Sequence, residues 1–257
     1  MPPHRRHDYF ERAAEYAARR PGYPPALAGW LAEVSPARRG AWDAGCGSGQ
    51  LSVLLAERFA EVVATDATPA QLAHARAHAR VRYAAATAEQ APLRSASIDL
   101  AVAAQAAHWF DLPRYFAEVR RVTRGAAVVA LVTYGVARVD DARADAVVRR
   151  FYHEVAGPHW PPERRLVEEG YASIDFPFGA IAAPAFTMQA EWSVEEMLGY
   201  VGTWSAVRRL ERSGGAAQVA AFEAELRPVW GAGKRAVTWP LTVRAGRVHP
   251  QRKQGEQ

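Results

Sequence analysis

A glycine-rich turn carries the clearest chemical signal in the sequence. It reads Asp43-Ala-Gly-Cys-Gly-Ser-Gly and lies between a short apolar run and a stretch with helical periodicity. Glycines permit positive φ and let a ligand lie against bare backbone, facing the N-terminus of the following helix. A nicotinamide-dinucleotide fingerprint has the spacing Gly-x-Gly-x-x-Gly, and here the third glycine comes one residue early. The spacing favours a ligand without a pyrophosphate; a nucleotide-binding turn of another type is the alternative.

A second candidate is Asp66, which ends the next apolar run. A carboxylate at the end of a neighbouring parallel strand can accept both hydroxyls of a ribose. An aspartate in this position is otherwise a helix cap or a turn residue. Because Thr68 is placed to cap the following helix, we predict that Asp66 is free to bind a ligand.

Three further candidates, Gln105, His108 and Trp109, follow a later apolar run. In open parallel sheets, ligands bind beyond the carboxyl ends of the strands. With an ordinary pKa of about 6.5, His108 is a candidate general base. An imidazole that is hydrogen-bonded within its own loop is the alternative.

Alternating short strands and helices must position these residues. The sequence predicts strands over 41–44, 62–65, 81–84, 98–103 and 126–133, and helices over 50–59, 68–79 and 112–122. Such alternation indicates βαβ units and a parallel sheet. Two helices are predicted to precede it: one begins at Asp8, with Glu11 at capping-box spacing, and ends before Pro21; the other covers 26–34.

The regular alternation of short strands and helices ends after Tyr134. An amphipathic helix is predicted over 141–155, a strand with turns within 176–192, a helix over 193–210 and a last strand over 236–243. We interpret this half as a cap and closing strands of the same sheet. The predicted organisation is one domain over 1–246, with an N-terminal helical lid (1–34), a binding core (40–134) and a cap with closing strands (135–246), followed by a flexible tail (247–257).

Composition excludes several classes of protein. Hydrophobic residues make up 49% and charged residues 23%, which suits a packed core rather than disorder. No apolar run reaches the roughly 18 residues of a membrane span, no secretory leader is recognisable, and one cysteine, Cys46, excludes a disulfide framework. The net charge is +5, but the basic residues are scattered arginines. We expect a cytoplasmic protein, a monomer or homodimer, with no metal, nucleic-acid or membrane partner.

The motifs resemble the class I S-adenosylmethionine-dependent methyltransferases, of the type 11 group and the branch similar to trans-aconitate methyltransferases. The likeness covers residues 9–134 well and continues loosely to Trp239-Pro-Leu. It rests on four segments: Asp43-Ala-Gly-Cys-Gly-Ser-Gly-Gln, Val63-Ala-Thr-Asp, Thr87-Ala-Glu-Gln-Ala-Pro-Leu and Ala104-Gln-Ala-Ala-His-Trp-Phe-Asp.

This resemblance implies a Rossmann-like α/β fold. The expected sheet is mostly parallel and seven-stranded, with helices on both faces and a helical cap inserted after the fifth strand. The implied reaction moves a methyl group by in-line displacement from S-adenosylmethionine to a small-molecule acceptor and releases S-adenosylhomocysteine. Oxygen of a carboxylate or hydroxyl is the favoured acceptor atom, and nitrogen is possible. The alternatives are an inactive regulatory protein that binds the cofactor, or a nucleic-acid methyltransferase.

The resemblance also implies roles for single residues. Gly45 and Gly47 would face the methionine and ribose, and Asp43 would lie near the methionyl ammonium. Asp66 would hold the ribose hydroxyls. The adenine would contact Ala67, Ala88 and Thr87, which stands where relatives usually have aspartate.

Residues near the chain start and in the cap complete the expected site. In Tyr16-Ala-Ala-Arg-Arg20-Pro-Gly-Tyr23-Pro, Arg20 would reach the cofactor carboxylate while Tyr16 and Tyr23 cover the methionine end; a surface arginine beside buried tyrosines is the alternative. Gln105 would contact the cofactor, and His108 would act as a base or position the acceptor. The expected acceptor walls are Tyr23, His108, Trp109, Tyr134, Trp160, Tyr200 and Trp204. Arginines near the cap, among them Arg138, Arg164 and Arg208, could bind an acidic acceptor or be solvated.

Overall fold

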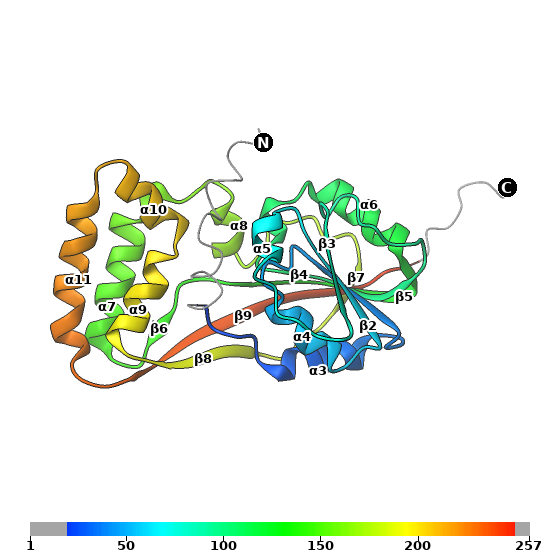
Figure 1. Cartoon of the computed structure of the whole chain (residues 1–257), viewed down its shortest axis with the longest axis horizontal. Coiled ribbons are helices and arrows are strands. Elements are labelled where there is room, and N and C mark those ends of the chain that lie inside the picture. The colour runs from blue at the N-terminus through cyan, green and yellow to red at the C-terminus, as the bar shows by residue number, and fades with distance from the viewer. Residues whose placement is uncertain (1–19, 250–257) are drawn as a thin grey trace.

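Nine strands form one sheet within residues 20–249, the part of the chain that the computed structural model describes (Figure 1). They are β1 (Gly40–Ala44), β2 (Glu61–Asp66), β3 (Val81–Ala85), β4 (Ile98–Ala104), β5 (Thr123–Tyr134), β6 (Arg138–Val139), β7 (Gly179–Ile181), β8 (Phe186–Trp192) and β9 (Arg235–Arg247). The order is β3-β2-β1-β4-β5-β9-β6, and β7 and β8 also pair with β9. The first five strands are parallel, as predicted.

Strand β9 explains why the sheet has nine strands rather than the seven predicted. It is 13 residues long and pairs antiparallel with β5 through its second half, residues 241–247. Its first half pairs with β6 and β8, and its last residues pair with β7. One continuous strand therefore links the parallel sheet to the cap, as the long red arrow in Figure 1 shows.

Helices cover both faces of the parallel strands. Helices α3 (Pro25–Val34) and α4 (Gln50–Ala56) pack on one face through Leu27, Leu31, Leu51 and Leu55. Helix α6 (Leu112–Val122) packs on the other face. Neighbouring residues of β5 alternate between these two layers, and the central strands are largely apolar because neither face meets water. Covered faces of this kind characterise the Rossmann-like fold that the sequence predicts.

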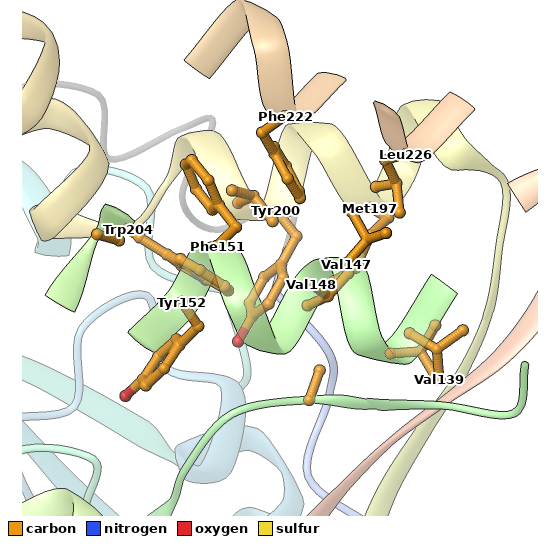
Figure 2. Packing of buried hydrophobic residues seen from close by; sticks show 14 of the residues in the cluster. Val139, Val147, Val148, Phe151, Tyr152, Met197, Tyr200, Trp204, Phe222 and Leu226 are labelled. Carbon is orange, nitrogen blue, oxygen red and sulfur yellow. The ribbon is translucent and has the colours of Figure 1, made fainter. Parts of the chain in front are cut away.

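The cap forms a separate hydrophobic cluster at one end of the sheet (Figures 1 and 2). Helix α7 (Ala142–Arg150) continues as a π-helical turn, Phe151–Val155. Around it lie α9 (Val194–Gly202), α10 (Ser205–Arg212) and α11 (Ala216–Trp230), while the short α8 (Arg164–Glu168) lies nearer the sheet. The rings of Phe151 and Phe222 stack with centroids 4.0 Å apart, which joins α11 to the turn after α7.

Several predicted boundaries are wrong for identifiable reasons. Helix α5 (Pro69–Leu72) ends well before residue 79, because Arg76 bonds by its N–H to Ser48 and by its carbonyl to the Tyr83 hydroxyl. The helix predicted over 193–210 is two helices, since the extended backbone of Trp204 separates α9 from α10. Helices α8 and α11 were not predicted.

The two ends of the chain test the predictions only in part. The first predicted helix and Tyr16 lie outside the described residues. Helix α3, assigned to the lid, packs on α4 and the sheet. The tail predicted from Arg247 begins too early, because Arg247 pairs within β9 and Val248 is buried, with its N–H bonded to the carbonyl of Ala127.

Residues 20–249 contain no helix that is long and apolar enough to cross a membrane. Over the same range, no three His, Cys, Asp or Glu side chains are grouped so that they could hold a metal ion.

Candidate active site

A cavity opens at the carboxyl ends of β1, β2 and β4, and we call it the loop cavity. Its walls are the glycine-rich turn, the residues that follow β2, β3 and β4, and a few side chains from elsewhere. Nine of the predicted cofactor residues line it: Arg20, Asp43, Gly45, Gly47, Asp66, Ala67, Thr87, Ala88 and Gln105.

The glycine-rich turn needs glycine at two positions in particular. Gly45 has φ +70°, and a Cβ there would lie 2.5 Å from the Cβ of Ala106. Gly49 has φ +75° at the N-cap of α4, and a Cβ there would collide with the Tyr83 hydroxyl. The N–H groups of Gly45 and Cys46 both donate to the carbonyl of Thr65, at 2.7 and 2.9 Å. These constraints keep the turn close to β2 and its backbone open to the cavity.

Asp43 is a buried carboxyl group in the wall of the loop cavity. Its Oδ2 accepts a 2.6 Å bond from the Ser52 hydroxyl, whereas Oδ1 has no hydrogen-bond partner among residues 20–249. Burial, assisted by the negative charge of Asp66, raises the pKa of Asp43 to about 7. A cationic ligand group beside Oδ1 would satisfy this oxygen and favour its ionised form.

Asp66 is held by backbone N–H groups rather than left free. Its Oδ2 accepts from Gly47 at 2.9 Å and its Oδ1 from Thr68 at 2.8 Å. Burial raises its pKa, and these bonds oppose the rise. The Thr68 side chain makes no capping bond, so our reason for expecting a free Asp66 was wrong. Each carboxylate oxygen still has a second lone pair. Asp66 can therefore hold the turn and accept hydrogen bonds from a ligand at the same time.

A second pocket lies between the loop after β4 and the cap, and we call it the cap pocket. It shares Arg20, Gln105, Trp109 and Tyr134 with the loop cavity. The two spaces are therefore neighbours, divided by these side chains. Of the predicted acceptor residues, His108, Trp109, Tyr134, Trp160, Tyr200 and Trp204 line the cap pocket, while Tyr23 lines only the loop cavity.

Gln105 shapes the boundary between the two spaces. Its backbone is left-handed, with φ +55°, which is uncommon for a residue other than glycine. Its side-chain Oε1 accepts from the Thr133 hydroxyl (2.8 Å) and the Tyr134 N–H (3.1 Å), and its Nε2 donates to the Tyr134 carbonyl (3.1 Å). The amide that we assigned to the cofactor is thus engaged with the end of β5.

His108 is a half-buried imidazole in the wall of the cap pocket. Its Nδ1 lies 3.0 Å from the hydroxyl of Tyr171, far along the chain and not in its own loop. Burial, together with the positive charge of Arg164, lowers the pKa of His108 to about 3. A ring with this pKa is a much weaker base than the one that the sequence led us to expect.

Two arginines reach the cap pocket. Arg20 donates to the Tyr134 hydroxyl at 3.1 Å and lies over the Tyr200 ring. Arg164 donates through Nε to the Tyr152 hydroxyl at 2.9 Å and stacks on Trp160, 4.6 Å from the ring centroid. Of the three cap arginines that the sequence singled out, only Arg164 lines the pocket; Arg138 is exposed.

The comparisons with known proteins agree with this geometry. Residues 42–131 match a family described as a methyltransferase domain. The solved structure of a proposed type II methyltransferase from Anaeromyxobacter dehalogenans is 51% identical, with a TM-score of 0.84 over 90% of this chain and 99% of that one. The chain belongs to the class I S-adenosylmethionine-dependent methyltransferases.

Two sequence relatives of this methyltransferase match over shorter stretches. A proposed methyltransferase of Dictyostelium discoideum is 30% identical over 174 residues, which are 67% of this chain and 66% of that protein. The malonyl-[acyl-carrier protein] O-methyltransferase of Pectobacterium atrosepticum is 36% identical over 107 residues, or 40% of this chain and 42% of that protein. The chain thus spans just under two thirds of the first relative's length and less than half of the second's.

The methyl donor of this class of methyltransferases, S-adenosylmethionine, suits the groups of the loop cavity. The donor is a cationic nucleoside, and the cavity presents the carboxyl groups of Asp43 and Asp66 beside bare glycine backbone. The partnerless Oδ1 of Asp43 is the position where an ammonium would be bound most favourably.

Sequence reasoning missed some lining residues of both spaces. Gln71, Glu89 and Phe110 line the loop cavity, and Tyr152 and Thr203 line the cap pocket. Tyr152 falls on the apolar face of the amphipathic helix predicted over 141–155, where a hydrophobic pattern cannot separate a core residue from a pocket residue. For Gln71 the spacing of five residues after Asp66 was visible, but nothing marked it as buried.

Proposed function

We propose that this methyltransferase transfers the methyl group of S-adenosylmethionine to a carboxylate oxygen of a small acid bound in the cap pocket. The lining of that pocket carries the proposal: it contains Arg20 and Arg164 but neither aspartate nor glutamate among the described residues. Aromatic side chains supply most of the remaining wall. Such a pocket favours an anion joined to an apolar body.

A second observation favours an acceptor rich in hydrogen-bond acceptors. The indole Nε1 of Trp160 is buried without a hydrogen-bond partner within residues 20–249. It lies in the wall next to Arg164. A carboxylate could accept from both, whereas an ammonium, which has no lone pair, could accept from neither.

The chemistry requires little from the protein beyond orientation. S-adenosylmethionine supplies a methyl group already activated on a sulfonium. A carboxylate is anionic before it reacts, so the new O–C bond forms as the S–C bond breaks, and no proton is released. The neutral His108 is therefore not needed as a base. Arg164 and Arg20 would orient the carboxylate, and orientation alone can account for large rate enhancements.

In the loop cavity we assign roles as the resemblance implied, except that Arg20, which the resemblance placed at the cofactor carboxylate, is assigned to the acceptor. Asp66 would hold the ribose hydroxyls and Asp43 the methionyl ammonium, while Ala67, Thr87 and Ala88 would line the adenine site. The Pectobacterium relative is named an O-methyltransferase acting on a malonyl group, and this name supports oxygen as the acceptor atom here.

The test is turnover with matched acceptors. Purified protein is given S-adenosylmethionine and a panel of small carboxylic acids, each beside its amide and alcohol. We expect release of S-adenosylhomocysteine and formation of a methyl ester only with acids. Methylation of the alcohols or amides but of no acid would refute the carboxylate. Tight binding of S-adenosylhomocysteine without turnover on any acceptor, including a cell extract, would favour the regulatory alternative.

A further inference from the structure

A buried amide in the wall of the loop cavity, that of Gln71, lacks hydrogen-bond partners among residues 20–249. Gln71 is 1% exposed, yet neither its Oε1 nor its Nε2 has a hydrogen-bond partner within residues 20–249. Nearly all buried polar side-chain groups in proteins are hydrogen-bonded. An amide that forgoes both its acceptor and its donor bonds therefore calls for a partner outside the described residues.

The position of Gln71 points to a ligand rather than to a packing defect. It lies on α5, the single helical turn after β2, and its N–H bonds to the carbonyl of Thr68. Its side chain lines the loop cavity. By contrast, the partnerless Tyr115 hydroxyl and Trp230 indole line neither the loop cavity nor the cap pocket, so an apolar neighbourhood accounts for them.

The neighbours of Gln71 indicate which part of a ligand it meets. Its Oε1 lies 3.8 Å from the place that a Cβ on Gly47 would occupy. The N–H of Gly47 donates to Oδ2 of Asp66, the carboxylate assigned to the ribose. The Gln71 amide thus shares the Asp66 side of the cavity.

The hydrogen-bonding groups of a ribose match those of Asp66 and Gln71. A carboxylate can only accept hydrogen bonds, so Asp66 can bind the two ribose O–H groups but leaves their oxygen atoms without a donor. A primary amide has two N–H donors. We infer that Gln71 donates through Nε2 to a ribose hydroxyl oxygen of the bound nucleoside and is a cofactor-binding residue of this enzyme.

This inference rests on the proposed placement of the cofactor and makes a distinctive prediction. Replacing Gln71 with methionine keeps the length of the side chain and removes both polar groups. Since the ligand-free protein then buries no unsatisfied amide, its melting temperature should stay the same or rise. Its affinity for S-adenosylhomocysteine should fall about 3- to 10-fold, the range for one net hydrogen bond. A residue that only supports packing would not weaken binding while the fold is preserved.

The experiment compares wild type, Gln71→Met and the exposed control Gln218→Met by calorimetry and thermal melts. The ligands are S-adenosylhomocysteine and its 2′-deoxy and 3′-deoxy analogues. Against one deoxy analogue, wild type and Gln71→Met should bind equally, because the hydroxyl in question is gone. Unchanged affinity of Gln71→Met for S-adenosylhomocysteine, or the same weakening with both analogues, would overturn the inference. Failure of wild type itself to bind would instead contradict the proposed function.

Discussion

The loop cavity and the cap pocket share four side chains but are built from different parts of the chain. The loop cavity comes mainly from short segments that follow β1, β2, β3 and β4, with backbone at its surface. The cap pocket is lined by residues 20, 105, 108–109, 134–136, 152, 160–161, 164, 200 and 203–205. On the proposed assignment, binding of the cofactor is thus local in sequence, whereas recognition of the acceptor depends on long-range packing.

The two spaces also differ in charge. Asp43, Asp66 and Glu89 line the loop cavity, where Arg20 is the only basic residue among the described lining. The cap pocket has Arg20 and Arg164 and no acidic lining residue. A cationic donor and an anionic acceptor would each enter the space of opposite charge and meet at the shared boundary. Mutations on one side should therefore affect one ligand and spare the other.

We expect the largest effect from replacing Asp66, on the loop-cavity side. Asp66→Ala removes the ribose acceptor and the anchor for the N–H groups of Gly47 and Thr68. We expect S-adenosylhomocysteine binding to weaken by about 2–3 kcal/mol, measured by calorimetry. The exposed Asp175→Ala is the control. Undiminished affinity in Asp66→Ala would remove this residue from the site.

The converse change is Arg164→Gln in the cap pocket. Loss of one charge-assisted bond, worth about 1.5–3 kcal/mol, should lower kcat/KM for the acid acceptor roughly 10- to 100-fold. The affinity for S-adenosylhomocysteine should not change. Arg138→Gln, at an exposed position outside both spaces, provides the comparison. If Arg164→Gln weakens the binding of both ligands equally, the assignment of the two ligands to separate spaces is wrong.

These differences also explain what could be predicted from the sequence. The glycine spacing and Asp66 identified the loop cavity because turn geometry and strand ends are encoded within a few residues. The cap was harder. Helix α11 was missed although Phe222, Leu226 and Trp230 recur at helical spacing, since Pro228 within the helix argues against it. The role of Arg164 depends on Trp160 and Tyr152, which only the folded cap brings beside His108 and Gln105.

A smaller effect concerns the pH dependence of the loop cavity. The folded-state pKa of Asp43, about 7, lies above its ordinary value of 3.8. The folded protein therefore keeps a proton that the unfolded chain has lost. The stability this gives is complete below pH 3.8 and is lost as the pH rises to about 7. Binding of an ammonium needs the ionised carboxylate, so S-adenosylhomocysteine affinity should rise about tenfold from pH 6 to pH 8. Asp43→Asn should flatten both profiles in calorimetry and thermal melts. A wild-type affinity that is constant over this range would argue against the contact.

The smallest expected effect is that of His108, whose sequence position suggested a general base. Because burial and Arg164 lower its pKa to about 3, the ring is neutral throughout pH 5–8, and activity should not rise through the ordinary pKa of about 6.5. A carboxylate acceptor needs no base, so His108→Asn, which keeps hydrogen bonding but loses basicity, should retain activity within about threefold. Base catalysis would instead contribute about 10²–10⁴-fold.

His108→Ala should lose more activity than His108→Asn, because the contact with the Tyr171 hydroxyl and the shape of the cap pocket are both lost. Turnover of wild type and both variants on one acid, followed from pH 5 to pH 8, makes the measurement. A loss of turnover of 100-fold or more in His108→Asn would indicate that His108 acts as a general base, and it would favour a hydroxyl or an amine as the acceptor.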